Sequence, residues 1–153
     1  VPGKGSQILM IDRRYAVLVG RRDNEGYLAI YDVTTASGGI VTPTRLSTPI
    51  TLPDLRTATI LDTGTSKYVV AGYPGAMVDA VNAGKVLVFP LSLTTGIDPT
   101  PAMTLHDAQP ETAQQFGRSV AVTQFNGSNV IAVGADNEVF LYFRTLLYDD
   151  TRQ

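Results

Sequence analysis

Two adjacent residues, His106 and Asp107, are the pair in this sequence best suited to acid–base chemistry. A histidine beside a carboxylate can act as a general base, but it then needs a nucleophile within hydrogen-bond reach. No Gly-x-Ser-x-Gly turn is present to supply a nucleophilic serine. The single histidine and the lack of cysteine also leave zinc without its usual ligands. We therefore expect no catalytic residue here, and no enzyme activity.

Phosphate and nucleic-acid binding are disfavoured by pattern and by charge. A glycine-rich phosphate loop opens a helix, and neither residues 3–5 nor residues 72–75 precede a helical pattern. The chain has 12 basic and 14 acidic residues, for a net charge of −2. The arginines at 13–14 and 21–22 lie among acidic residues, whereas nucleic acids require a concentrated positive field. We expect no nucleic-acid partner.

Composition favours a β protein with well-buried strands. The sequence is 44% hydrophobic and only 17% charged, against roughly 25% charged in an average globular protein. Valine, alanine, threonine and glycine are abundant, which is typical of strands buried on both faces. No apolar run reaches the length of a membrane-spanning helix, so we expect no membrane insertion.

A two-strand unit occurs three times along the chain. Each unit has an apolar strand that ends in glycine, then a polar turn, then a second apolar strand that ends in an aromatic residue. The marker glycines are Gly20, Gly72 and Gly134, and their spacing suits one blade of a β-propeller. The paired strands are expected at 15–20 and 26–31, at 68–72 and 84–89, and at 130–134 and 138–142.

Further strands flank each unit and complete a four-stranded pattern. Upstream strands are expected at 7–11, 57–61 and 119–123. Downstream, 48–52 and 101–105 alternate weakly and contain proline, which an outer edge strand tolerates.

The first strand of each two-strand unit lacks polar–apolar alternation, so both of its faces should be dry, as between neighbouring blades. The sequence thus predicts an all-β fold, a single partial β-propeller over residues 1–153. It would contain about three blades of four antiparallel strands, with repeats at about 7–54, 55–107 and 114–147.

Two of the units carry a more specific pattern. Residues 116–122 read Phe-Gly-Arg-Ser-Val-Ala-Val, 125–128 read Phe-Asn-Gly-Ser, and 133–136 read Val-Gly-Ala-Asp. In the second unit, 71–76 read Ala-Gly-Tyr-Pro-Gly-Ala and 83–89 read Ala-Gly-Lys-Val-Leu-Val-Phe. This ordered set resembles the FG-GAP repeat of integrin α-subunit propellers and of GPI-specific phospholipase D. The first unit keeps only the strand skeleton.

The resemblance implies a non-catalytic binding or adhesion module, extracellular or at the cell surface, that presents propeller loops to a protein partner. Members of this family close a ring with seven blades, which three cannot do. We therefore expect a piece of a longer propeller, a proteolytic product, or a protomer that completes a ring with another chain through open blade edges. Two alternatives remain: a structural repeat segment of a larger surface assembly or filament, and the non-catalytic propeller part of a larger enzyme.

The longest loop, residues 73–83, is the candidate partner-binding surface. Tyr73, Met77, Val78 and Val81 are apolar for an exposed turn. They could contact a partner, or they could pack on the adjacent blade.

Two further residues are candidates for a metal ion and a glycan. The family often holds Ca²⁺ in an Asp-x-Asp-x-Asp-Gly loop between the first two strands, and Asp62 is the best match to a ligand at that place. Otherwise we expect no cofactor. Asn126 begins an Asn-Gly-Ser sequon, which permits glycosylation of a secreted protein, although Asn-Gly is also a turn signal.

Overall fold

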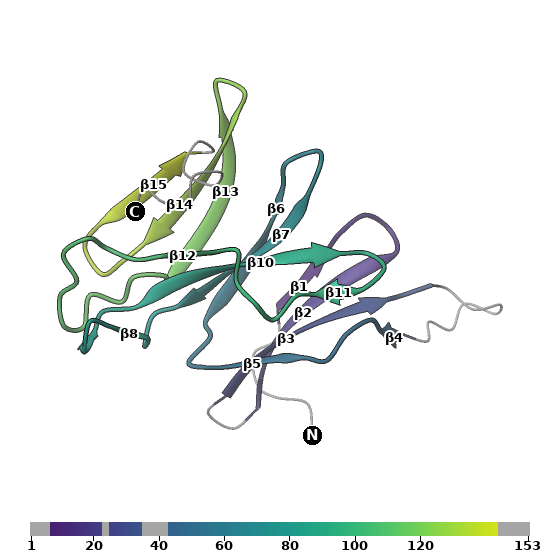
Figure 1. Ribbon diagram of the computed structural model, residues 1–153, viewed down its shortest axis with the longest axis horizontal. Helices are drawn as coiled ribbons and strands as arrows, with labels where there is room; N and C mark the ends of the chain where they lie inside the picture. Colours follow the sequence, from purple (N-terminus) through teal and green to yellow (C-terminus); the bar gives the residue numbers. More distant parts are fainter. Residues whose placement is uncertain (1–6, 23–24, 35–42, 144–153) are drawn as a thin grey trace.

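The computed structural model describes residues 7–22, 25–34 and 43–143, and within these ranges it contains strands and turns but no helix. Figure 1 shows antiparallel sheets that follow one another along the chain. The expectation of an all-β fold is confirmed.

Three sheets and one small hairpin account for the strands, and we name the sheets first, middle and last. The first sheet contains β1 (Gln7–Met10), β2 (Tyr15–Arg22), β3 (Glu25–Asp32), β4 (Thr44–Arg45) and β5 (Ile50–Pro53). The middle sheet contains β6 (Thr57–Asp62), β7 (Lys67–Tyr73), β10 (Lys85–Ser92), β11 (Gly96–Ile97) and β12 (Met103–Leu105). The last sheet contains β13 (Ser119–Phe125), β14 (Ser128–Gly134) and β15 (Val139–Phe143), and the hairpin pairs β8 (Met77–Val78) with β9 (Val81–Asn82).

Each sheet is a meander in which successive long strands are hydrogen-bonded neighbours. The order β1-β2-β3-β5 in the first sheet is repeated as β6-β7-β10-β12 in the middle sheet. The proline-containing downstream segments form strands at the outer edge, as their sequence predicts. The sheets fall within 7–54, 55–107 and 114–147, although residues 144–147 lie outside the described part.

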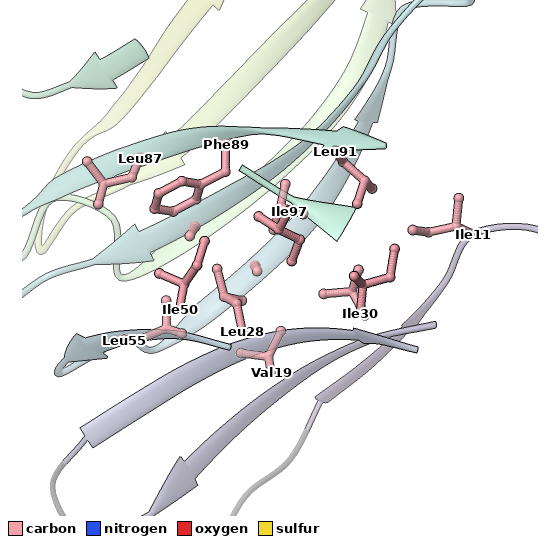
Figure 2. Packing of buried hydrophobic residues seen from close by; sticks show 14 residues of the cluster. Ile11, Val19, Leu28, Ile30, Ile50, Leu55, Leu87, Phe89, Leu91 and Ile97 are labelled. Atoms are coloured by element: carbon pink, nitrogen blue, oxygen red, sulfur yellow. The ribbon is translucent and has the colours of Figure 1, made fainter. Parts of the chain in front are cut away.

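The middle sheet is packed on both faces. We call the face of a sheet that is turned toward the next sheet along the chain its leading face, and the opposite face, turned toward any preceding sheet, its trailing face. The leading face of the first sheet therefore meets the trailing face of the middle sheet. Figure 2 shows the first core cluster, where leading-face residues such as Val19 and Leu28 meet trailing-face residues such as Leu87 and Phe89. A second cluster joins the leading face of the middle sheet, including Val88, to the last sheet.

This arrangement explains why strand β7 does not alternate in sequence. Val69 and Ala71 lie in the first cluster while Val70, between them, lies in the second, and all three are fully buried. The prediction that both faces are dry holds for this strand. It does not hold for the outer two sheets, where the matching central residues, Leu18 and Ala132, are only half-buried.

The three marker glycines do not occupy equivalent places, which corrects the alignment drawn from the sequence. Gly72 pairs with Thr57, and Gly134 pairs with Ser119, on the leading face of their sheets. In the first sheet Val19 points to the leading side, so Gly20 faces the trailing side. Strand β2 is therefore offset by one residue from β7 and β14, whereas β3 and β10 keep the alignment predicted from the sequence.

Gly72 and Gly20 also exclude a side chain for different steric reasons. A β-carbon at Gly72 would overlap the backbone carbonyl oxygen of Gly117, so glycine allows the connection before the last sheet to approach β7 closely. A β-carbon at Gly20 would instead overlap the ring of Tyr27, its partner on β3. Gly20 thus makes room for a tyrosine ring within its own sheet.

We predict that Gly72→Ala lowers the free energy of unfolding by about 1–3 kcal/mol, because the new methyl group meets backbone atoms that cannot rotate away. Gly134→Ala is the matched control, since its methyl group meets the rotatable hydroxyl of Ser119. We expect that control to stay within about 1 kcal/mol of wild type. Urea denaturation measures both variants, and equal losses would contradict the close approach at Gly72.

Candidate functional site

One end of the three sheets gathers the loops through which the chain passes from sheet to sheet. Residues 53–57 connect the first sheet to the middle sheet, and 105–119 connect the middle sheet to the last. The β8–β9 hairpin and the turn between β14 and β15 lie at the same end. We call this the connection end (Figure 1).

Backbone hydrogen bonds fix the loops of the connection end to one another. The amide of Ala113 donates to the carbonyl of Asn82 at 2.8 Å, and the amide of Phe116 donates to the carbonyl of Ala83 at 2.8 Å. Asp136, in the turn of the last sheet, donates its amide to the Gln114 carbonyl at 2.8 Å. The long connection is thus held between the β8–β9 hairpin and the last sheet.

Phe116 anchors this connection in the core. Its side chain is fully buried in the second cluster. Its ring lies 5.0 Å from that of Phe140 and 6.2 Å from that of Tyr142, in tilted and edge-on geometries that aromatic pairs prefer. The Phe-Gly pair singled out in the sequence therefore positions the loop that precedes the last sheet.

A hollow of about 500 Å³ opens at the connection end. Two arginines line it, Arg56 and Arg118, and each directly precedes the first strand of its sheet, β6 or β13. The repeated Arg-Thr and Arg-Ser dipeptides at 56–57 and 118–119 are the sequence signal for this pair, and the sequence reasoning missed it. The remaining lining residues are Asp54, Pro74, Gly75, Asn82, Ala113 and Gln115.

Each of the two arginines is paired with one carboxylate. Asp54 accepts a hydrogen bond from Arg56 Nε at 3.2 Å and lies 3.9 Å from Arg21 Nη2. Arg118 Nη1 is 3.4 Å from an Asp136 carboxylate oxygen. Both lining arginines are more than half exposed, and such pairs contribute little to stability. Because each guanidinium carries five N–H donors, most donors remain for a ligand.

Three residues of this hollow have a left-handed backbone. Asp54, Ala113 and Gln115 have φ angles of 56°, 62° and 56°, which non-glycine residues adopt rarely. Such conformations cost on the order of 1–3 kcal/mol each and occur where surrounding contacts impose them, often at binding sites. The hydrogen bonds of Ala113, Gln114 and Phe116 are those contacts here.

The candidate residues of the 73–83 loop divide into packed and exposed groups. Tyr73, at the end of β7, packs against the first cluster, and burial, followed by the nearby Asp54 charge, raises the pKa of its phenol. The Lys85 ammonium lies 5.8 Å from the centre of its ring. Val78 is 7% exposed and Val81 is half-buried, whereas Met77 is 57% exposed.

The turn of the β8–β9 hairpin explains this division. Asp79 and Ala80 form a two-residue loop with φ angles of 48° and 67°, the signature of the tight turns preferred in hairpins. Adjacent residues of a strand point to opposite sides, so Val78 turns inward and Met77 turns outward. Met77 is therefore the member of the set that offers an apolar contact to a partner.

Asp62, the calcium candidate, lies at the opposite end of the sheets. Its carboxylate accepts hydrogen bonds from Lys67 Nζ at 2.9 Å and from the Gly64 amide at 2.9 Å, which together hold its pKa below the usual value. Across the described ranges, no three His, Cys, Asp or Glu side chains gather around a common point. Calcium binding stays a prediction, and a cation would have to displace the Lys67 ammonium.

Asn126, the sequon asparagine, also lies at that opposite end, in the tight turn between β13 and β14. Asn126 and Gly127 have φ angles of 48° and 75°, so the dipeptide forms the turn that its sequence favours. The asparagine is exposed, and so is the adjacent Phe125. Its use as a glycan acceptor stays a prediction, although the geometry leaves the side chain accessible.

His106 and Asp107 are not arranged as a base and its orienting carboxylate. The Nδ1 atom of His106 is 2.8 Å from the backbone oxygen of Asp107, and the Asp107 carboxylate accepts a hydrogen bond from the Gln114 amide. Asp107 thereby fixes the long connection instead.

No protein-family model matches this chain, and no curated protein matches it as a relative. Within the described residues there is also no helix long and apolar enough to cross a membrane. The functional interpretation therefore depends on the residues and the geometry of the connection end.

We predict that Lys67→Ala raises the pKa of Asp62 toward its ordinary value, because the hydrogen bond from Lys67 is the main cause of the depression. A carboxylate whose pKa is lower in the folded state stabilises the fold at pH values above its pKa in the unfolded chain. This contribution is lost as the pH falls through the pKa of the folded state. Carboxyl NMR titration measures the shift. Asp32 is the internal control: Arg14 holds its pKa at about 2, which should not change.

We also predict that Val78→Ser destabilises the fold by about 1–3 kcal/mol, because it places a hydroxyl in a buried site. Met77→Ser, one residue away, should change the free energy of unfolding by less than about 0.5 kcal/mol, since that side chain is exposed. Thermal melts of the two variants provide the comparison. A large loss in Met77→Ser would mean that Met77 is packed in the native state.

Proposed function

We propose that this chain is part of a β-propeller of the FG-GAP type and acts as a non-catalytic, extracellular binding module. The sequence resemblance and the repeated four-strand meander support this assignment. The stacking supports it as well: β6 contacts β1 on one side and β13 on the other, so the first strands of the three sheets share one edge, as inner strands do around a propeller axis.

The proposed binding site is the hollow at the connection end, and its ligand is an acidic segment of a protein partner. The observation that carries this proposal is the pair Arg56 and Arg118, placed at matching positions of consecutive sheets around one hollow. A guanidinium binds a carboxylate through two parallel hydrogen bonds, which gives both affinity and orientation.

Neighbouring features suit a protein ligand. Met77 is the cross-strand partner of Asn82, a lining residue, so an exposed apolar side chain lies beside the hollow. The backbone hydrogen bonds of the connection end preform the site, which reduces the ordering cost of binding. A glycan on Asn126 would project from the opposite end and leave the hollow uncovered.

A second function, a structural segment of a larger assembly, is favoured by exposed apolar side chains on the outer faces of the first and last sheets. None of these side chains lines the hollow, so the two roles do not compete for the same residues.

The proposal predicts that wild-type protein binds acidic peptides in preference to the same peptides with Asp and Glu replaced by Asn and Gln. The double variant Arg56→Ala, Arg118→Ala should bind the acidic peptides at least about tenfold more weakly, because charge-assisted hydrogen bonds are lost. Fluorescence polarisation with labelled peptides measures the affinities at two salt concentrations, and binding should weaken as salt rises.

Arg45→Ala is the matched control, because Arg45 is an exposed arginine on β4, away from the hollow. It removes one positive charge of the same kind, half of what the double variant removes, and should leave peptide binding unchanged. Equal binding of the acidic and amide peptides, or an undiminished affinity in the double variant, would refute the arginine hollow as the recognition site.

A further inference from the structure

Within the described residues, one apolar face of the first sheet and one of the last sheet have no other sheet packed against them. On the leading face of the last sheet, Val139 is 71% exposed and Leu141 is 56% exposed, and Phe143 follows them along β15. On the trailing face of the first sheet, Ile8 is 65% exposed and Met10 is 55% exposed. Large apolar side chains grouped on one face usually mark a contact surface.

Strand register identifies the buried counterparts of the residues on β15. Gly134 pairs with Val139 as Gly72 pairs with Val86, and two residues further along β15 and β10 stand Leu141 and Val88. Val86 and Val88 are 0% and 1% exposed, because the last sheet covers them. The same positions that form an interface in the middle sheet are therefore repeated, with the same apolar chemistry, on the open face of the last sheet.

The first sheet has an equivalent relation at the other end of the stack. Once the one-residue offset of β2 is included, the pair Ile8 and Leu18 matches Ala58 and Ala71 on the trailing face of the middle sheet. Both alanines are buried against the first sheet. The trailing face of the first sheet thus repeats a position that is already part of an interface.

Both interfaces between the described sheets join a leading face to a trailing face, and the described part of the chain leaves one face of each kind uncovered. We propose that a second copy of this chain docks here, with the trailing face of its first sheet against the leading face of the last sheet. The inference rests on the stacked sheets of the proposed function, but not on the arginine hollow. The contact joins two different surfaces, so it is heterologous and can continue from copy to copy or close into a ring.

Size-exclusion chromatography with light scattering tests this contact on the 153-residue chain. The wild type should increase in mass above the monomer as its concentration rises. Leu141→Asp should remain monomeric, and so should Ile8→Asp, because each places a charge on one of the two faces that must become dry. Both residues are exposed in the single chain, so both variants should keep the circular dichroism spectrum and the melting temperature of a monomer.

Mixing the two variants separates a heterologous contact from a symmetric one. Leu141→Asp retains an intact first sheet and Ile8→Asp retains an intact last sheet, so the mixture should form a one-to-one dimer and nothing larger. If like faces paired instead, one single variant would still self-associate and the mixture would gain nothing, which would overturn the proposal. A wild type that stays monomeric at every concentration would overturn it as well.

A further pair of measurements keeps this proposal separate from the proposed function. Arg56→Ala, Arg118→Ala should associate like wild type, and Leu141→Asp should bind acidic peptides like wild type. Loss of association in the arginine variant would place the contact at the connection end and would contradict the docking of the open faces.

Discussion

The middle sheet must be kept from water on both of its faces at once, and the rest of the structure follows from that requirement. Val69, Val70 and Ala71 are consecutive and fully buried, so apolar partners must come from two directions. In the absence of a helix in the described residues, only another sheet can supply each partner layer. In such a stack the chain crosses from each sheet to the next at the connection end, so loops of all three sheets lie close together there.

Much of the fold could be predicted from local pattern, because strand identity depends on neighbouring residues. The consecutive aliphatic run at 69–71 indicates burial on both sides, and the prolines at 49 and 101 indicate outer edge segments. The direction of a side chain is harder to predict, since an error of one residue reverses it. Matching by residue type pairs Gly20 with Gly72, yet Gly20 lies on the trailing face of its sheet and Gly72 on the leading face.

The candidate site was less predictable, because it is assembled from segments that meet only in three dimensions. Arg56 and Arg118 are far apart in the chain, and their common place beside the hollow depends on the stacking of two sheets. Likewise, the difference between Met77 and Val78 depends on the β8–β9 hairpin, which the sequence suggested only as a loop. The Phe-Gly pair at 116–117 is visible in the sequence, and the buried ring of Phe116 holds the connection that contains Ala113 and Gln115.

The one-residue offset of β2 has a consequence for engineering. A consensus repeat built by aligning the three glycines would average residues from opposite sides of the sheet along β2, and it would mix solvent-facing with core-facing preferences there. A chimera that replaced residues of β2 with those of β7 on that alignment would place side chains suited to one face of the sheet on the other. The packing that Val17 and Val19 of β2 provide in the first core cluster would be disrupted. Exchange of modules within this protein therefore has to follow the direction of the side chains rather than the glycines.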